Sequence, residues 1–323
     1  MPNDDFSSKT RRKSLKRKVR WGRMIAFLLV LSLLGIIAAG LISAVKYIFF
    51  SPPGNFAATI PHGKTADSEF LKNNINILVM GLDGQKGDGS DKPRRSDSIL
   101  VCSFDVERKN VAFLSVPRDT RVRIPNKGMD KINHAYAYGG EMLARQVTAD
   151  FLSMPVSYHV VLDTEAFMHI VDILGGIGVY VENDMDYEDP YQKLYIHIKK
   201  GYQKLDGENS IKYVRYRSDE LGDVGRVLRQ QKFMKAFCET LFSSNGLLKA
   251  AYLRPVFAEG VKTDISMSAL FKMALSFKKY SKEGINFGML PGEFETVDDV
   301  SYWITDPVDV MHELDKLGIK YLK

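Results

Sequence analysis

The sequence predicts an α/β fold, with a central mixed β-sheet flanked by helices on both faces and preceded by one transmembrane helix. Two observations predict this architecture. Apolar runs of strand length alternate with longer segments of helical periodicity, an order typical of a sheet that helices cover on both sides. Near the N-terminus, 22 consecutive residues carry no charge, which is enough to cross a membrane as a helix.

The chain begins with a basic segment followed by the uncharged stretch. Residues 1–23 hold nine of the 45 lysines and arginines and two of the 39 acidic residues. We expect a disordered cytoplasmic tail, because basic residues stay on the inner side of a membrane. Residues 24–45 would span about 33 Å as a helix, and this apolar run is longer than that of a cleavable signal peptide. The span is therefore predicted to be a single-pass signal-anchor in the cell membrane.

Everything beyond the span is expected outside the cell. Residues 46–72 read as a linker, and residues 73–323 as one extracellular domain. Outside the tail, the chain contains 36 basic and 37 acidic residues, so the net charge of +6 belongs to the tail. No helix-turn-helix precedes the span, and nucleic acid is not an expected partner.

The extracellular domain begins with three strand patterns. Residues 76–80 read as a strand that ends at Gly81-Leu82-Asp83, and residues 98–104 and 111–116 read as two strands joined by a turn. Further strands are predicted at residues 157–162, 177–181 and 285–290, and helices at residues 141–152, 165–174, 246–252, 268–280 and 308–317, with another from Val224 onward.

The chain contains two cysteines, Cys102 and Cys238, and both lie in apolar surroundings where a thiol simply fills a core. Two cysteines make no disulfide framework. Whether they are bonded to each other stays open at this point.

A short stretch from Tyr213 to Gln231 concentrates cations. Four arginines fall within fifteen residues: Arg215, Arg217, Arg226 and Arg229. If residues 213–217 are extended, the first two leave the same face of a strand. A helix from Val224 would place the last two on one face together with Gln230.

Clustered guanidinium groups repel one another unless an anion lies between them. Their planar donors match phosphate oxygens, and the N-terminus of a helix also attracts anions. The stretch therefore predicts a site for a diphosphate. The alternative is that these arginines are solvated or paired with the acidic residues between them, which are Asp219, Glu220 and Asp223.

Carboxylates and a further arginine lie at predicted strand ends. Asp83 ends the first strand and Asp97 precedes the second, where ligands of α/β sheets commonly bind. Two carboxylates there would suit Mg²⁺, or Mn²⁺ in its place. Alternatively, Asp83 shapes a turn and Asp97 caps a strand. Pro117 ends the third strand because it cannot donate to the ladder, which directs Arg118 into the same crevice.

An ordered series of motifs resembles the LytR-CpsA-Psr proteins of bacterial envelopes. The match covers residues 76–237 and consists of GLD at Gly81, RSDS at Arg95, SVPRDT at Ser115, KINHAY at Lys131, LGGIGVYV at Leu174, YVRYR at Tyr213 and GDVGRVLRQQ at Gly222. The resemblance implies an enzyme that takes an anionic glycopolymer, of teichoic acid or capsule type, from a polyprenyl diphosphate. It joins this polymer to a peptidoglycan hydroxyl as a phosphodiester.

The resemblance also implies a role for each matching residue. Metal binding falls to Asp83 and Asp97, and diphosphate binding to Arg95, Arg118, Arg215, Arg217, Arg226, Arg229 and Gln230, with Gln231 closing the signature. Arg118, Arg215, Arg217 and Arg226 are the expected catalytic residues. Two differences from the family pattern make the geometry of the metal site harder to infer from the resemblance. Ser98 stands where many members have threonine, and the loop before Arg95 is long. Asp97, Asp119 and Asp223 remain alternatives for a general base.

Phosphoryl transfer fits these residues, because it needs positioning and charge neutralisation more than a protein nucleophile. The polyprenyl chain would need an apolar tunnel between the sheet and the helices. Two other functions stay open: a phosphatase or pyrophosphatase that uses water as the acceptor, and a non-enzymatic, membrane-anchored envelope regulator. The sequence does not identify the glycopolymer, the acceptor hydroxyl, the tunnel residues or the oligomeric state.

Overall fold

The computed structural model describes residues 74–82, 96–190, 194–216, 222–253, 255–256, 260–266, 269–270, 272–273, 276–277 and 285–322. The predicted tail, span and linker lie outside these residues. No helix in the part of the chain that the structure describes is long and apolar enough to cross a membrane.

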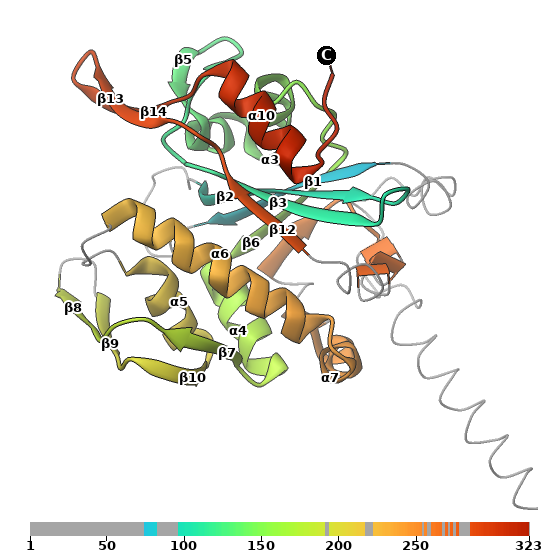
Figure 1. The fold of residues 1–323 in the computed structure, drawn as a ribbon, viewed down its shortest axis with the longest axis vertical. Helices are drawn as coiled ribbons and strands as arrows, with labels where there is room; N and C mark the ends of the chain where they lie inside the picture. Colours follow the sequence, from blue (N-terminus) through green and yellow to red (C-terminus); the bar gives the residue numbers. More distant parts are fainter. Residues whose placement is uncertain are drawn as a thin grey trace, which may run out of the picture. The chain divides into compact units, whose positions relative to one another are not determined.

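A six-stranded mixed sheet forms the centre of the domain (Figure 1). Its strands, in spatial order, are β11 (Val261–Thr263), β6 (Tyr158–Asp163), β1 (Ile75–Leu82), β2 (Ser96–Asp105), β3 (Asn110–Val116) and β12 (Ile285–Met289). β1 pairs parallel with β6, and β3 pairs parallel with β12, whereas the other three pairings are antiparallel. The predicted mixed sheet is therefore confirmed.

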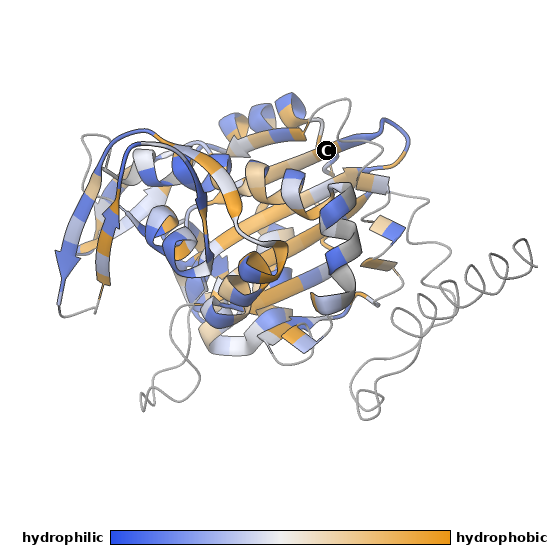
Figure 2. Cartoon of the chain, turned by 90° about the horizontal axis from the view of Figure 1, so that it is seen from below, coloured by the Kyte–Doolittle hydropathy of each residue, from blue (hydrophilic) through white to orange (hydrophobic). Residues whose placement is uncertain are grey.

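Helices cover both faces of this sheet, as Figure 1 shows. On one face lie α3 (Ile132–Phe151) and α10 (Pro307–Leu317), and on the other lie α4 (Thr164–Leu174), α5 (Gly207–Arg215) and α6 (Gly222–Leu241). α6 leads into α7 (Ser244–Lys249) and the short helix η1 (Ala250–Leu253). In Figure 2 the central strands are mostly hydrophobic, as expected for a sheet buried on both faces.

Alternation along the strands separates two core layers, because successive side chains of a strand point to opposite faces. Leu78 and Met80 of β1 belong to the core that α3 and α10 cover. Ile75 and Ile77, two residues apart on the same strand, belong to a second core with Cys102. The second core also contains Phe104, Val111, Phe113, Cys238 and Phe277. We call this layer the α6-side core.

Four two-stranded sheets surround the central sheet, three of them hairpins, and of their strands the sequence predicted only residues 177–181. They are β4 (Arg121–Ile124) with β5 (Gly128–Lys131), β7 (Ile177–Val181) with β10 (Gly201–Leu205), β8 (Met185–Asp189) with β9 (Leu194–Ile198), and β13 (Glu293–Val297) with β14 (Val300–Ile304). The last hairpin is attached to the loop after β3, because the Trp303 amide donates to the Asp119 carbonyl at 2.9 Å.

The expectation of an extended segment at residues 213–217 is wrong for its described part. Residues 207–215 form the helix α5, and only Tyr216 is extended. The Asp206 side chain caps this helix by accepting from the Asn209 amide at 2.8 Å. Lys212 pairs with Glu208 one turn earlier. The capping aspartate and this charge pair were the overlooked signals of a helix.

The element α3 consists of two helical segments, because Gly139 and Gly140 between them have non-helical backbone angles, with φ of −151° and 64°. The segment after Gly140 agrees with the helix predicted at residues 141–152, whereas the segment that begins at Ile132 was not predicted. At the end of α4, by contrast, Gly175 takes the left-handed conformation with φ of 85° and stops the helix as predicted.

Both cysteines are buried, free thiols in the α6-side core. Burial raises the pKa of Cys102 and of Cys238, so both remain protonated. The open question of a disulfide is answered in favour of two packed thiols.

Candidate active site

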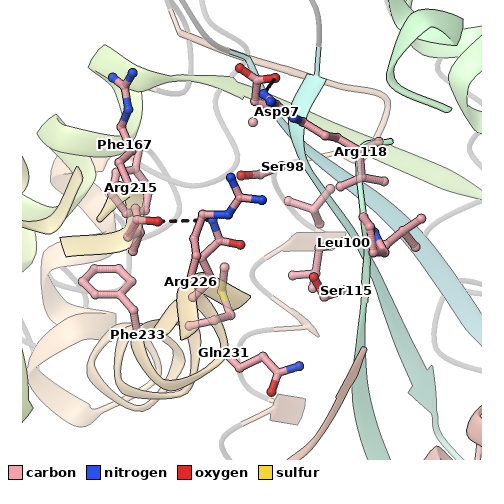
Figure 3. Close-up of a pocket in the computed structure, with 18 of the residues that line it drawn as sticks. Asp97, Ser98, Leu100, Ser115, Arg118, Phe167, Arg215, Arg226, Gln231 and Phe233 are labelled. Carbon is pink, nitrogen blue, oxygen red and sulfur yellow. Dashed lines mark hydrogen bonds and ion pairs between the residues drawn. The ribbon is translucent and has the colours of Figure 1, made fainter. Parts of the chain in front are cut away.

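A pocket of about 680 Å³ lies between the sheet and the helices α4, α5 and α6. Figure 3 shows its lining, with Arg118 and Arg215 toward the top of the view, Phe233, Ser115 and Gln231 toward the bottom, and Arg226 between them. The lining residues that matter below are Val79, Gly81, Asp97, Ser98, Leu100, Ser115, Arg118, Phe167, Arg215, Arg226, Gln230, Gln231, Phe233, Met234 and Phe287. We call this cavity the main pocket.

The floor of the main pocket is a continuation of the α6-side core. Val79, Leu100 and Ser115 lie opposite one another on three neighbouring strands, and Gly81 lies opposite Ser98 one step further along. These positions share a face with the α6-side core, because on each strand they are an even number of residues away from the residues of that core. Three of these five residues are small, so the layer opens into a cavity where side chains would otherwise fill it.

Two helix ends bring cations to the mouth of the main pocket. Arg215 is the last residue of α5, and Arg226 lies in the second turn of α6. Both line the pocket together with Gln230, whose amide donates to the Val214 carbonyl at 3.3 Å. The N-terminal end of α6 adds the positive end of its helix dipole. The arrangement favours an anion with several oxygens.

Arg118 enters the same mouth from the sheet, just after Pro117 ends β3 (Figure 3). Its Nη1 donates to Asp97 Oδ1 at 2.7 Å, and its Nε lies 3.5 Å from Asp119 Oδ2. Burial opposes the charge of this guanidinium, but the carboxylates of Asp97 and Asp119 outweigh it, so the pKa of Arg118 is raised. Arg118 is therefore a permanent cation held in a fixed orientation.

Three predicted site residues, Asp83, Arg95 and Arg217, lie outside the described residues. Their neighbours Leu82 and Ser96 are paired across β1 and β2. The structure brings together Asp97, Arg118, Arg215, Arg226, Gln230 and Gln231 of the predicted set.

Arg229 departs from its predicted place, because it does not line the main pocket. Its side chain is buried, with an exposed fraction of 6%. Its Nη2 donates to the Tyr216 carbonyl at 2.7 Å, and its guanidinium lies 5.3 Å from the centre of the Tyr216 ring. Arg226 and Gln230, one turn apart, take the pocket face of α6, which leaves Arg229 facing the end of α5. Its contacts are those of a residue that fastens α5 to α6.

Asp97 is the described candidate for metal binding. Its carboxylate lies at the mouth of the main pocket and is 31% exposed. The other described carboxylate in the lining, Asp163, caps α4 by accepting from the Ala166 amide. Within the described part of the chain, no three potential ligands converge on one point. Mg²⁺ needs only one or two carboxylates when phosphate and water oxygens complete its shell, so Asp97 fits such an ion.

Sequence reasoning missed the residues that the β13–β14 hairpin supplies. Phe294 and Trp303 line the main pocket, and their rings meet edge to face with centroids 5.1 Å apart. They lie far along the chain from the motifs at the strand ends. No local pattern marks them, because contacts between segments distant in the sequence, such as the pairing of Trp303 with the loop after β3, bring the hairpin here.

Comparisons with known proteins found a family model and relatives over most of the chain. The LytR_cpsA_psr family model matches residues 57–317, starting inside the predicted linker. The polyisoprenyl-teichoic acid--peptidoglycan teichoic acid transferase TagU of Oceanobacillus iheyensis is 26% identical over 321 residues, 94% of this chain and 95% of that protein. The regulatory protein MsrR of Staphylococcus aureus is 35% identical over 205 residues, 63% of this chain and 60% of that protein.

Solved structures with the same fold include a ligand complex. The structure of TagT bound to LIIa-WTA superimposes with a TM-score of 0.63 and 26% identity, over 77% of this chain and 91% of that one. The fold described above therefore also occurs in a protein whose structure is solved with such a ligand bound.

Proposed function

The chain belongs to the LytR_cpsA_psr family, and we propose that it transfers an anionic glycopolymer, of teichoic acid or capsule type, from a polyprenyl diphosphate to a peptidoglycan hydroxyl. One observation carries the proposal: an apolar cavity that leads directly to a mouth lined by Arg118, Arg215 and Arg226. A lipid diphosphate has this same order of apolar and anionic parts. The name of the relative TagU supports the glycopolymer and the acceptor class.

In the proposed complex, the prenyl chain lies along the apolar part of the main pocket. Leu100, Phe233 and Phe287 give this part its apolar lining. The diphosphate then lies at the mouth, where planar guanidinium groups can each donate two hydrogen bonds to phosphate oxygens. Arg118 keeps its orientation there, because Asp97 and Asp119 hold two of its nitrogens.

Transfer then requires one substitution at phosphorus. The acceptor oxygen forms a bond to the phosphorus that carries the glycopolymer, and the bond from this phosphorus to the bridging oxygen breaks, which leaves polyprenyl phosphate. Negative charge accumulates on the phosphate oxygens as this happens, and preorganised arginines stabilise it. No protein nucleophile is needed, since the acceptor brings its own hydroxyl.

We also propose that Asp97, with Asp83, holds Mg²⁺ or Mn²⁺. A divalent ion bound there supplies additional positive charge to the diphosphate oxygens. The support is the chemistry of the Asp97 carboxylate at the mouth of the pocket and the order of the two aspartates around adjoining strand ends.

The direct test is a reaction with purified full-length chain in detergent, a polyprenyl diphosphate-linked glycan and soluble peptidoglycan strands. We expect a phosphodiester-linked product that appears with Mg²⁺ and is lost on addition of a chelator. Glycan phosphate formed at the same rate with and without peptidoglycan, and no linked product, would identify a hydrolase and refute transfer.

The metal assignment has its own control. Asp97→Asn should raise the Mg²⁺ concentration for half-maximal rate about tenfold or more, since even changes behind a metal ligand commonly cost that much. Asp184→Asn, at an exposed carboxylate that pairs with Lys199 outside the main pocket, should leave the Mg²⁺ dependence unchanged. An unaltered Mg²⁺ requirement in the Asp97 variant would contradict the assignment.

We further propose that the catalytic domain lies outside the cell, anchored by residues 24–45. The support is the uncharged stretch of 22 residues beside a basic tail. Protease added to cells stripped of their wall should digest residues 73–323 and spare residues 1–23. Protection of the C-terminal part would exclude an extracellular transferase.

One relative favours a second candidate function. MsrR is named a regulatory protein, which is consistent with a non-enzymatic envelope regulator. A regulator that does not bind the lipid diphosphate would tolerate loss of the arginines at the mouth, whereas a transferase would not. The Arg118 variants discussed below separate the two.

A further inference from the structure

A second cavity, of about 300 Å³, adjoins the main pocket at Asp97 and Arg118. Its lining comes from the start of β2, the turn after β3, the junction of β5 with α3, and β14. The residues are Asp97, Arg118, Asp119, Lys131, Asn133, His134 and Val300. We call it the side pocket. Asp97 and Arg118 line both cavities, so together they form the boundary between them.

The charges of the side pocket balance. Its described lining holds two carboxylates, Asp97 and Asp119, and two cations, Arg118 and Lys131. The main pocket, in contrast, is lined by three described arginines and two aspartates, one of which caps a helix. A second anion would find no excess of positive charge in the side pocket. A neutral ligand with several hydroxyl or amide groups matches its donors and acceptors.

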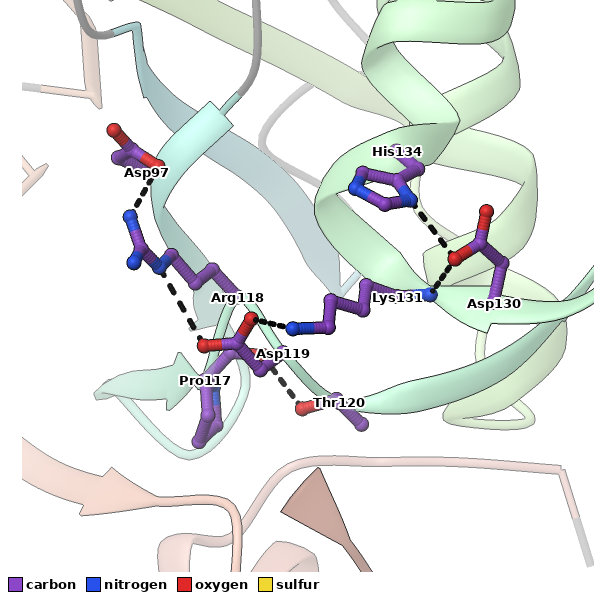
Figure 4. Close-up of polar contacts among 8 residues, drawn as sticks. All are labelled: Asp97, Pro117, Arg118, Asp119, Thr120, Asp130, Lys131 and His134. Atoms are coloured by element: carbon purple, nitrogen blue, oxygen red, sulfur yellow. Dashed lines mark hydrogen bonds and ion pairs between the residues drawn. The ribbon is translucent and has the colours of Figure 1, made fainter. Parts of the chain in front are cut away.

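The walls of the side pocket are held in place by their own contacts, as Figure 4 shows. Lys131 Nζ donates to Asp119 Oδ1 at 2.8 Å, which fixes both side chains. His134 Nδ1 lies 2.8 Å from Asp130 Oδ1. The backbone amide of Asn133 donates to the Arg118 carbonyl at 3.2 Å, which ties the start of α3 to the boundary between the pockets. Such fixed walls lower the ordering cost of binding.

Asn133 provides an independent sign of a ligand. Its side chain is only 4% exposed and lines the side pocket. Its Oδ1 has no hydrogen-bond partner among the residues that the structure describes. Buried polar atoms are normally satisfied, and one left without a partner is destabilising. A hydroxyl or amide of a ligand in the side pocket would satisfy it.

We propose that the side pocket binds the acceptor of the reaction, one neutral sugar unit of a glycan strand with a free hydroxyl. This inference rests on the proposed transfer. The hydroxyl reaches the boundary between the pockets, and its oxygen forms the new bond to phosphorus. Its proton passes to the Asp119 carboxylate, and the bridging oxygen leaves with polyprenyl phosphate. Donor and acceptor therefore meet at Arg118, each from its own pocket.

Two variants test the side pocket in different ways. Asn133→Ala removes a polar contact, and Val300→Trp fills the cavity from the hairpin. Val300 is 40% exposed, so tryptophan there does not disturb the core, and this variant still tests the proposal if the first one folds poorly. Asn286→Ala and Val308→Trp are the matched controls, because both residues are exposed and outside both pockets.

The measurement uses the full-length chain with a polyprenyl diphosphate-linked glycan as donor and soluble peptidoglycan strands as acceptor. We expect Asn133→Ala to raise KM for the acceptor about tenfold and to change KM for the donor less than twofold, as expected when one hydrogen bond to the acceptor is lost. Val300→Trp should lower the ratio of transfer to donor hydrolysis at least as much. Asp119→Asn should lower the rate constant of transfer more than it raises KM for the acceptor.

Three results would overturn the assignment. The first is an unchanged KM for the acceptor in Val300→Trp. The second is a side-pocket variant that loses donor binding while its ratio of transfer to hydrolysis stays unchanged. The third is an effect of equal size in the control variants. Failure of the proposed function gives a different result from failure of the side-pocket assignment. If the proposed function is wrong, the unaltered chain forms no linked product. Direct binding of peptidoglycan strands to the unaltered chain and to Val300→Trp then still tests the side pocket. Binding that Val300→Trp abolishes supports the pocket, and equal binding refutes it.

Discussion

Replacing Arg118 with alanine should lower the rate of glycopolymer transfer about 10²- to 10³-fold, the loss typical when one preorganised donor to a developing charge is removed. The effect is expected to be large because Asp97 and Asp119 hold this guanidinium in position before any substrate arrives. Arg118→Lys should recover only part of the rate, because lysine keeps the charge and loses the planar pair of donors. For both variants, the transfer rate and the affinity for the lipid diphosphate are measured.

Stability measurements separate function from folding in this experiment. Removal of one of several crowded arginines relieves repulsion between like charges in the empty protein. At Arg118 this gain is offset, because its two partner carboxylates would lose their ion pairs. Those pairs are partly exposed, so we expect a loss of no more than about 1 kcal/mol. Arg108→Ala, at an exposed arginine, is the control. Normal transfer by a strongly destabilised Arg118→Ala would make Arg118 a structural residue.

Replacing Ser115 with tryptophan should weaken binding of a long-chain polyprenyl diphosphate about 10²-fold or more. Ser115 lies on the floor of the main pocket, beside Leu100 on the neighbouring strand. An indole there occupies the space proposed for the prenyl chain. Burial of an isoprene unit resembles that of a leucine side chain, at about 1.5–3 kcal/mol, so excluding two units corresponds to roughly 10²- to 10⁴-fold.

Donors of different chain length make this test specific. The affinity of Ser115→Trp for a short-chain diphosphate should change little, since the arginines at the mouth are untouched. Its preference for the long chain should disappear. Ser157→Trp, at an exposed serine before β6, should behave like the unaltered protein. If Ser115→Trp keeps the full preference, the lipid lies elsewhere.

The features that the sequence predicted correctly are those with local causes. The strands near residues 98–104 and 111–116, and the turn between them, follow from continuous apolar runs separated by turn-forming residues. Pro117 limits β3 through its missing donor, so the place of Arg118 at a strand end was predictable as well.

The features that the sequence did not predict depend on contacts between segments that are distant along the chain. Whether Arg229 faces the pocket or α5 is decided by how α5 and α6 pack, and α5 itself was not predicted. Trp303 joins the site because its backbone pairs with the loop after β3. Asn133 reaches the side pocket because its amide bonds to the Arg118 carbonyl. None of these contacts has a signature in the residues themselves.

Because the floor of the main pocket continues the α6-side core, binding of the proposed lipid donor there would affect the stability of the fold. At Gly81, Ser98 and Ser115 the chain leaves part of this apolar layer for another molecule to complete. A prenyl chain bound there would act as a removable part of the hydrophobic core. Each tenfold excess of free donor over its Kd then adds about 1.4 kcal/mol to the free energy of unfolding. Without a disulfide between its two cysteines, the domain would resist unfolding best when the membrane is rich in donor.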